Sequence, residues 1–290
     1  MKLLVTGAKG QVGTELAQQS LALGWEVKAI DYKELDITDL EAVRASVSSF
    51  EPDVVINAAA YTAVDKAESE PDTAFTVNKT GPENLAKVCS EFDILLVHYS
   101  TDYVFDGSKA GAYLESDQVF PLGVYGESKL AGEIAVARNS SKYLILRTSW
   151  VFSAHGNNFV KTMLRLGGER EELGVVGDQY GKPTCAAEIS RLTLELLSKA
   201  KDHWGVYHLA QPEAVSWHEF SRVVFDEAAR QGMSLQVKRV NAITTADYPT
   251  PAKRPAKSEL DCTLLEQTFN VSIRPWRESL SDVIKELRHV

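Results

Sequence analysis

The chain has 290 residues, 44% of them hydrophobic and 24% charged, which is enough core-forming material for one large domain or two coupled ones. Its formal net charge of −9 disfavours nucleic acid or an anionic membrane as the main partner, and its three widely spaced cysteines form neither a CxxC pair nor a disulfide framework. No stretch approaches the roughly 18 apolar residues of a membrane span, and the apolar start MKLLV ends too early for a signal peptide, so we expect a soluble, cytoplasmic protein.

Short apolar runs recur along the chain and predict strands that are buried on both faces. In chain order they cover residues 2–6, 26–31, 53–59, 94–100, 143–148 and 206–210. Amphipathic stretches lie between them and predict helices, among them 12–23, 39–49, 72–91 and 127–138. This alternation indicates right-handed βαβ units and therefore an α/β fold with a Rossmann-like, doubly wound parallel sheet.

After Trp150 the alternation of strands and helices weakens. Residues 245–258 contain three prolines and cannot form a regular helix or a central strand. Residues 186–200 and 206–210 nevertheless read as a helix and a buried strand that return to the sheet. We therefore predict a dinucleotide-binding domain of residues 1–152 plus about 181–212, and a smaller, interleaved C-terminal substrate-binding domain of about 153–180 plus 213–290.

The segment VTGAKGQVGTEL places three glycines, Gly7, Gly10 and Gly13, directly after the first strand and before a helix. Glycines let the backbone turn tightly and approach a pyrophosphate, which then lies on the helix N-terminus. The spacing is GxxGxxG rather than the commoner GxGxxG, and any βα turn can use glycine. The position at the first strand favours nucleotide binding, with Gln11 and Val12 as further contacts of the same loop.

Asp31 ends the second strand, where a carboxylate can bind the 2′-hydroxyl of an adenosine ribose and so favour NAD. Lys9 and Lys33 lie nearby in the sequence and would tolerate a 2′-phosphate. We therefore expect the use of both NADPH and NADH. Asp36 is positioned to accept a hydrogen bond from the adenine amino group, with Ile37 packing on the ring.

The third strand ends in NAAAYTAVD, whose small side chains leave room for a flat ligand. Strand packing explains Ala58 equally well. Ala59, Ala60 and Thr62 are the predicted cofactor contacts of this segment.

The fourth strand ends in HYSTDYVFDG, a polar stretch at the edge where doubly wound sheets bind ligands. Ser100 and Thr101 offer hydroxyls, Asp102 a carboxylate and Tyr103 an aromatic face. A simple turn at the end of a strand would explain each of them alone, so their significance depends on the next motif.

That motif is VYGESKLAGE, which places Tyr125 and Lys129 four residues apart on one face of a predicted helix. A tyrosine has an unperturbed pKa near ~10 and is a poor acid at neutral pH unless its surroundings lower that value. Lys129, helped by an oxidised nicotinamide, would stabilise the phenolate, and it can also hold the nicotinamide ribose. Thr101 would hydrogen-bond the substrate oxygen. A chance surface pair is the alternative, and the preceding glycine loop disfavours it.

The segments GAKGQVG, NAAAYTAVDKAE, HYSTDYVF, VYGESKLAGE, RTSWVF and TPAKRP closely resemble those of the extended short-chain dehydrogenase/reductase family, over nearly the whole chain. The resemblance implies hydride transfer from NADPH or NADH to a dTDP-sugar, reducing the C4 ketone of dTDP-4-dehydro-6-deoxy-L-mannose to dTDP-L-rhamnose for bacterial surface polysaccharide. It further implies catalysis by Tyr125 as proton donor, Lys129 as its tuner and Thr101 as hydroxyl partner. The substrate contacts that it implies are Asp102, Tyr103 and Trp150 at the sugar and Asn158 and Arg254 at the nucleotide diphosphate.

Some related reductases dimerise around magnesium held by glutamates. Glu15 matches one such position, but Glu188 is one position out of step. We therefore predict no metal site and leave monomer and homodimer open.

Two other functions remain as alternatives to a reductase. One is a nucleotide-sugar epimerase of the same family, which would keep its NAD bound through many turnovers. The other is a non-catalytic subunit resembling the regulatory β subunit of methionine adenosyltransferase, although intact Thr101, Tyr125 and Lys129 favour an enzyme. A dehydratase is disfavoured because Asp102 is followed by Tyr103 and not by a second acid.

Overall fold

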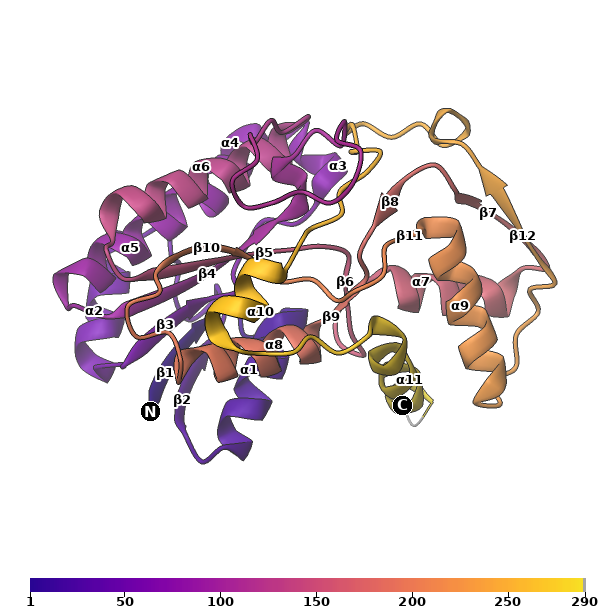
Figure 1. Cartoon of the computed structure of the whole chain (residues 1–290). Helices are drawn as coiled ribbons and strands as arrows, with labels where there is room; N and C mark the ends of the chain where they lie inside the picture. Colours follow the sequence, from indigo (N-terminus) through magenta and orange to yellow (C-terminus); the bar gives the residue numbers. More distant parts are fainter. Residues whose placement is uncertain (289–290) are drawn as a thin grey trace.

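A six-stranded, all-parallel sheet forms the centre of the computed structural model, which describes residues 1–288 (Figure 1). Its strands follow the predicted apolar runs: β1 (Lys2–Thr6), β2 (Glu26–Ile30), β3 (Val54–Asn57), β4 (Leu95–Thr101), β5 (Tyr143–Thr148) and β10 (Gly205–His208). The order across the sheet is β10-β5-β4-β3-β1-β2. The predicted Rossmann-like parallel sheet is thus confirmed.

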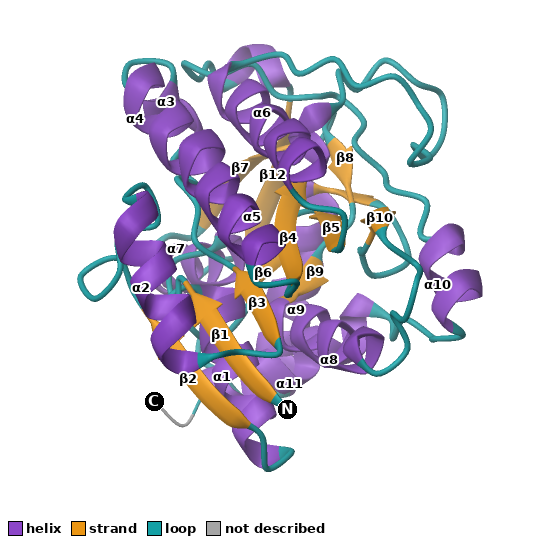
Figure 2. Ribbon diagram, turned by 90° about the vertical axis from the view of Figure 1, so that its left-hand side faces the viewer, coloured by secondary structure: helices purple, strands orange, loops and turns teal. Residues whose placement is uncertain are grey.

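Helices cover both faces of this sheet, as Figure 2 shows. One face packs against α2 (Leu40–Phe50), α5 (Gly81–Glu91) and α6 (Val124–Asn139), and the other against α1 (Gln11–Ala22), α8 (Ala186–Leu197) and α10 (Thr263–Phe269). Leu3 and Val5 point to one face of β1 and Leu4 to the other, and all three are fully buried. Burial on both faces explains why the apolar runs are continuous rather than alternating.

The strand order reverses between β1 and β3, which lie side by side although β2 comes between them in the chain. Thr6 pairs with Ile30 on one side and with Asn57 on the other, so the carboxyl ends of the three strands meet at one edge. In sheets of this kind a ligand binds in the crevice outside such a reversal.

The helix predicted over residues 72–91 is interrupted. It consists of α4 (Pro71–Phe75), a single π-helical turn η1 (Thr76–Thr80), and α5. Gly81 begins α5 where a Cβ would meet the Ile37 side chain at 2.5 Å, so the chain passes very close to the loop after β2. The amphipathic pattern continues through the wide turn and therefore does not reveal it.

A second, smaller body lies beside the sheet (Figure 1) and has its own apolar core around Phe152, Phe220 and Trp276. It contains α7 (Phe159–Glu169), α9 (Trp217–Arg230), α11 (Trp276–Leu287) and the parallel pair β7 (Glu172–Val176) and β12 (Arg239–Ile243). The remaining short elements are α3 (Val64–Ala67), η2 (Asp102–Val104), β6 (Val151–Phe152), β8 (Tyr180–Gly181), β9 (Thr184–Cys185), β11 (Val215–Ser216) and η3 (Thr245–Asp247).

The segment of residues 252–262, which we call the strap, runs from the smaller body back to the sheet body (Figure 1). The Tyr113 N–H donates to the Glu259 carbonyl at 2.7 Å, and the Tyr113 carbonyl accepts from the Asp261 N–H at 2.8 Å. After the strap, Leu265 and Phe269 of α10 pack in the core of the sheet. The predicted division of the chain into two domains stays a prediction. It assigns residues 260–273 to the substrate-binding domain, whereas their apolar side chains pack in the core of the sheet.

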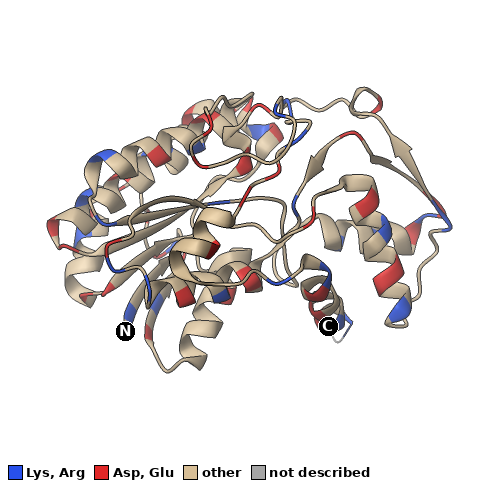
Figure 3. Cartoon of the chain, viewed as in Figure 1, with Lys and Arg blue, Asp and Glu red and all other residues tan. Residues whose placement is uncertain are grey.

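Acidic and basic side chains are interspersed over the helices of both bodies (Figure 3). None of the helices within residues 1–288 is long and apolar enough to cross a membrane.

Candidate functional site

A cavity of about 540 Å³ lies at the carboxyl edge of β1, β2 and β3. Gly7 adopts a left-handed φ of 70°, and a Cβ on it would lie 2.5 Å from the Ala59 backbone nitrogen, so only glycine fits there. Seven predicted cofactor contacts line this cavity: Gly7, Gly10, Asp31, Asp36, Ile37, Ala59 and Ala60. Lys9 and Tyr32 also line it.

The other predicted contacts of this region lie around the cavity rather than in its wall. Gly13 lies beneath the loop, where a Cβ would collide with the Gly7 carbonyl oxygen. Val12 packs against the core of the sheet, and Thr62 is exposed. The Gln11 side chain accepts hydrogen bonds from Ser153 Oγ at 3.1 Å and from Asn158 Nδ2 at 2.9 Å.

These residues fit a dinucleotide. Helix α1 begins after Gly10 with no side-chain cap and no acidic residue in its first turn, so its first N–H groups are free to bind a phosphate. Asp31 lies beside them, with Lys9 Nζ 3.8 Å from its carboxylate. Asp36 already accepts hydrogen bonds from the Thr38 N–H and hydroxyl, at 2.9 and 2.7 Å, so one of its oxygens shapes the loop.

The residues around Tyr125 explain how α6 reaches the end of β4. Gly126 contacts the turn after β4 so closely that a Cβ would collide with the Tyr103 carbonyl oxygen. Ser128 is fully buried, donates to the Tyr125 carbonyl and accepts from Asn78 of η1. The Glu68 carboxylate caps the helix by accepting from the Val124 N–H at 2.9 Å, a non-local contact that the motif does not signal.

Lys129 is buried one turn below Tyr125 and donates from Nζ to the Tyr99 carbonyl at 2.6 Å. Burial lowers the pKa of Lys129 to about 8, and the Glu133 carboxylate works against this. Burial also raises the pKa of Tyr125, while a hydrogen bond with Thr101 works against that rise. The free chain therefore does not lower the pKa of the Tyr125 hydroxyl. The bound cofactor and substrate would have to supply the expected lowering.

Thr101 ends β4, Asp102 begins η2, and both residues are buried. The Thr101 hydroxyl donates to Asp102 Oδ1 at 3.0 Å, and Ser258 of the strap donates to Asp102 Oδ2 at 2.6 Å. Burial raises the pKa of Asp102 to about 6, against the effect of these hydrogen bonds. Asp102 has 1% of its surface exposed and contacts Thr101 and Ser258, and its contact with the sugar stays a prediction.

A second cavity, of about 600 Å³, lies between the turn after β4 and the smaller body. Tyr103 lines it, and its ring packs edge to face on Tyr125 with centroids 5.5 Å apart. Trp217 also lines it and stacks flat on Trp150, with ring centroids 3.4 Å apart. Trp150 thus supports the wall from behind, in a left-handed backbone conformation with φ of 45°.

Arg254 lines the same cavity and donates to the Asp65 carboxylate at 2.8 Å. Asn158 does not line it. Its side chain caps α7 by accepting from the Lys161 N–H, and its amide donates to Gln11 and to the Ser153 carbonyl. The substrate contact of Asn158 stays a prediction, and the structure brings this residue together with the loop before α1.

Sequence reasoning missed several residues here, namely Trp217, Asp65, Glu68 and Ser258. Each one acts through a partner more than 50 positions away. Only Trp217 has a local signal, an aromatic residue directly after a capping serine. No local pattern encodes such pairings.

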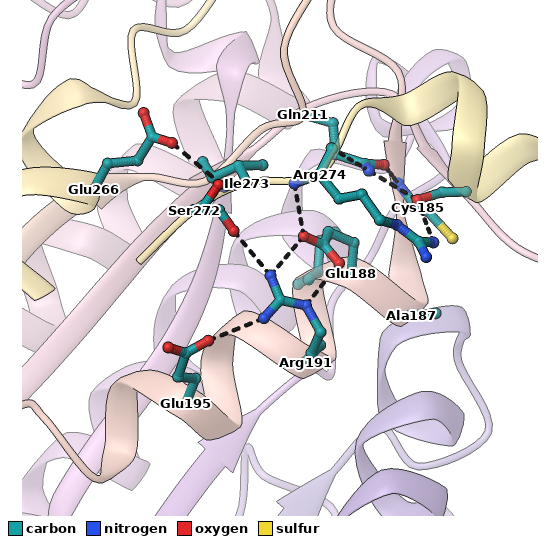
Figure 4. A network of polar contacts seen from close by, with 12 residues as sticks. Cys185, Ala187, Glu188, Arg191, Glu195, Gln211, Glu266, Ser272, Ile273 and Arg274 are labelled. Carbon is teal, nitrogen blue, oxygen red and sulfur yellow. Dashed lines mark hydrogen bonds and ion pairs between the residues drawn. The ribbon is translucent and has the colours of Figure 1, made fainter. Parts of the chain in front are cut away.

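Glu188, the residue out of step with a magnesium site, is buried in a network of polar contacts (Figure 4). Its carboxylate accepts from Arg191 at 2.8 and 2.9 Å and from the Arg274 N–H at 3.0 Å. Gln211 joins the same network by donating to the Arg274 carbonyl at 2.7 Å. The oxygens of Glu188 are therefore engaged in joining α8 to the chain after α10. Within residues 1–288, no group of three His, Cys, Asp or Glu side chains is arranged to hold a metal ion.

Comparison with known proteins gives consistent matches along the full length. The family described as "RmlD substrate binding domain" matches residues 1–289. A dTDP-4-dehydrorhamnose reductase of Aggregatibacter actinomycetemcomitans is 47% identical over 97% of this chain and 98% of its own.

Solved structures agree. A dTDP-4-dehydrorhamnose reductase of Clostridium acetobutylicum superposes with a TM-score of 0.93 at 40% identity, covering 99% of this chain and 100% of its own. The same enzyme of Bacillus anthracis, solved in complex with NADP, has a TM-score of 0.92 at 36% identity, with 98% and 99% of the two chains covered.

Proposed function

The chain belongs to the RmlD family, whose relatives are dTDP-4-dehydrorhamnose reductases, and from this membership we propose how its residues carry out the reduction. The reaction is the NAD(P)H-dependent reduction of the C4 ketone of dTDP-4-dehydro-6-deoxy-L-mannose to dTDP-L-rhamnose. The observation that carries the proposal is the meeting of Thr101, Tyr125 and Lys129 at the end of β4, next to the wall of the second cavity.

The first cavity holds the cofactor. The loop from Gly7 to Gly13 and the uncapped start of α1 bind the pyrophosphate, and Ala59 and Ala60 leave room for the flat rings. Bound NADPH or NADH supplies a hydride to C4 of the sugar. Lys129 holds the nicotinamide ribose, which requires its Nζ to share its protons between the ribose and the Tyr99 carbonyl.

Tyr125 donates the proton. Its hydroxyl gives a proton to the C4 oxygen as hydride arrives at C4, so the ketone becomes an alcohol and Tyr125 becomes a phenolate. The Thr101 hydroxyl lies beside Tyr125 and positions the oxygen, for which its single proton must turn from Asp102 toward that oxygen. Because burial alone raises the pKa of Tyr125, the charge of Lys129 and that of the oxidised nicotinamide are needed to stabilise the phenolate.

The second cavity holds the nucleotide-sugar. Tyr103 connects it to Tyr125 by direct ring contact, so a sugar against Tyr103 presents C4 to the proton donor. Trp217, supported by Trp150, forms the opposite apolar wall. Arg254 provides a guanidinium that can bind two diphosphate oxygens at once.

Substitution at the catalytic pair tests this assignment. Tyr125→Phe is expected to lower kcat by roughly 10²-fold or more, the usual scale for a positioned proton donor, while NADPH binding stays nearly unchanged. Lys129→Met is expected to weaken both turnover and NADPH binding. Stopped-flow or steady-state NADPH oxidation and a fluorescence titration of NADPH measure the two effects. Wild-type turnover in Tyr125→Phe would contradict the mechanism.

The family membership favours a reductase over an epimerase or a regulatory subunit. The reductase consumes one NAD(P)H per sugar, whereas an epimerase would show no net consumption, so stoichiometric NADPH oxidation with the keto-sugar decides between them. We also propose that the enzyme acts in the cytoplasm, as a monomer or homodimer. The three buried free thiols support a reducing compartment.

A further inference from the structure

Ser258 reaches the catalytic centre from the other end of the sequence. It lies in the strap, has 1% of its surface exposed, and donates from Oγ to Asp102 Oδ2 at 2.6 Å. The other oxygen of the same carboxylate accepts from the Thr101 hydroxyl at 3.0 Å. A continuous chain of buried hydrogen bonds therefore runs from the strap to the residue that contacts Tyr125.

The donor and acceptor of each hydrogen bond between Ser258, Asp102 and Thr101 are defined. Ser258 and Thr101 each have one hydroxyl proton, and both donate to the Asp102 carboxylate. These two donors favour the ionised carboxylate against the cost of burial. The Thr101 oxygen also accepts from the Tyr103 N–H at 3.2 Å, so its hydroxyl is fixed from two sides.

We propose that Ser258 is a positioning residue for the reduction: through Asp102 it fixes the place of the Thr101 side chain beside Tyr125. This inference rests on the proposed roles of Thr101 and Tyr125. Ser258 has no role of its own at the substrate, because the carboxylate separates it from Thr101.

The Ser258 hydroxyl is not what docks the strap. The strap is held by backbone contacts that any residue at position 258 would keep, including the Ser258 N–H to the Tyr180 carbonyl at 2.9 Å and the two Tyr113 contacts. Gly107 also lies so close to the strap that a Cβ would meet Pro255 at 2.7 Å. The side-chain hydrogen bond to Asp102 therefore adds orientation rather than attachment.

The strap also carries Arg254, four residues before Ser258, into the wall of the substrate cavity. One short segment thus contacts both the proposed diphosphate site and the support of Thr101. The ionisable groups that face Asp102 are Tyr103 on η2 and Tyr125 on α6, with Arg254 and Asp65 one shell further out beside Tyr103. Among these, no cation contacts the carboxylate directly, so Ser258 is a main support of its charge.

The test compares Ser258→Ala with Ser258→Thr, which keeps the hydroxyl, and with Ser221→Ala. Ser221 is a fully buried serine of α9 whose hydroxyl donates to the His218 carbonyl. In Ser258→Ala we expect kcat to fall about 10-fold, the scale for losing one hydrogen bond to a charged group, with the KM for NADPH unchanged. Ser258→Thr is expected to restore most of the activity, and Ser221→Ala to resemble the wild type.

The pH dependence of kcat distinguishes a positioning role of Ser258 from a purely structural one, because loss of packing alone would not shift it. Removal of a donor raises the pKa of the Asp102 carboxyl above its value of about 6, so the acid limb of kcat should move to higher pH in Ser258→Ala. Thermal unfolding and NADPH titration check that each variant is folded.

Two results would overturn the inference. One is an unchanged kcat and acid limb in folded Ser258→Ala. The other is a loss of activity that Ser258→Thr shares, which would indicate packing instead. Tyr125→Phe is assayed in parallel: if it retains turnover, the proposed function fails, whereas its inactivity beside a normal Ser258→Ala rejects only the role of Ser258.

Discussion

Each of the two charged residues expected to select ligands already has a partner of opposite sign. Asp31 lies 3.8 Å from Lys9, and Arg254 lies 2.8 Å from Asp65. The sequence predicts the charged residue in both cases, because its place at a strand end or in a proline-rich loop is local. The sequence predicts only that Lys9 lies near Asp31. It does not predict Asp65 as the partner of Arg254, because these two residues are 189 positions apart.

Asp31→Ala is expected to shift cofactor preference toward NADPH, because it removes a negative charge that faces the ribose 2′ position. Lys9 would remain to attract the 2′-phosphate. The measurement is the ratio of kcat/KM for NADPH to that for NADH. Asp93→Ala is the control, because Asp93 precedes β4 and so lies at the opposite edge of the sheet. An unchanged ratio would show that Asp31 does not face the cofactor.

Arg254→Ala is expected to weaken binding of the nucleotide-sugar much more than binding of NADPH. The Asp65 carboxylate would compete with the diphosphate proposed to bind this guanidinium, so Asp65→Asn is expected to tighten nucleotide-sugar binding. Separate calorimetric titrations of dTDP and NADPH measure both effects. Lys253→Ala is the matched control, because its side chain is exposed on the same loop. Equal affinities for dTDP in all variants would place the diphosphate elsewhere.

At the scale of elements, local sequence patterns predict the strands of the sheet and the turns that follow them, but they do not predict the strap. The continuous apolar runs predict each of the strands β1 to β5 and β10, because burial on both faces imposes that pattern. The strap has no such pattern. It is fixed by backbone hydrogen bonds to Tyr113 and Tyr180, and its composition indicates only that it is irregular.

The turn between β1 and α1 gives a prediction at this scale. Gly13→Ala would bring a Cβ into collision with the Gly7 carbonyl oxygen, so the loop must move and its N–H groups lose their alignment. We expect NADPH affinity to fall more than 10-fold, roughly the effect of losing one or two charge-assisted hydrogen bonds. Gly168→Ala in α7, where nothing lies within 4 Å, is the control and should raise stability by up to about 1 kcal/mol. Normal NADPH binding by Gly13→Ala would contradict the close contact.

At the scale of the whole molecule, stability depends on a buried histidine between the sheet and the strap. His208 Nδ1 lies 3.1 Å from two carbonyl oxygens, those of Tyr113 and Asp261, and Nε2 faces Arg147 at 3.5 Å. The carbonyls require a proton on Nδ1, and Arg147 disfavours one on Nε2, so the ring is neutral. Burial is the main reason that the pKa of His208 falls to about 3.

The unfolded chain takes up a proton at His208 near pH 6.5, whereas the folded chain does so only near pH 3. The free energy of unfolding should therefore fall as the pH drops through this window, with a slope of about 1.4 kcal/mol per pH unit from this residue. Asp102, with its pKa raised to about 6, acts in the opposite direction. His208→Gln keeps an N–H donor and cannot titrate, so its unfolding free energy between pH 7 and 5 should fall less than that of the wild type. Parallel pH dependences in urea unfolding would contradict the neutral, buried ring.

The interleaving of the two bodies limits how such a protein can change over generations. The chain leaves the sheet body after β6, returns with α8, leaves again after β10, returns through the strap and leaves once more for α11. Two cuts in a gene therefore cannot excise the smaller body, and one recombination event cannot exchange it for another. Changes in the proposed substrate site are therefore expected to come from point substitution and loop insertion around Tyr103, Trp217 and Arg254 rather than from shuffling of modules.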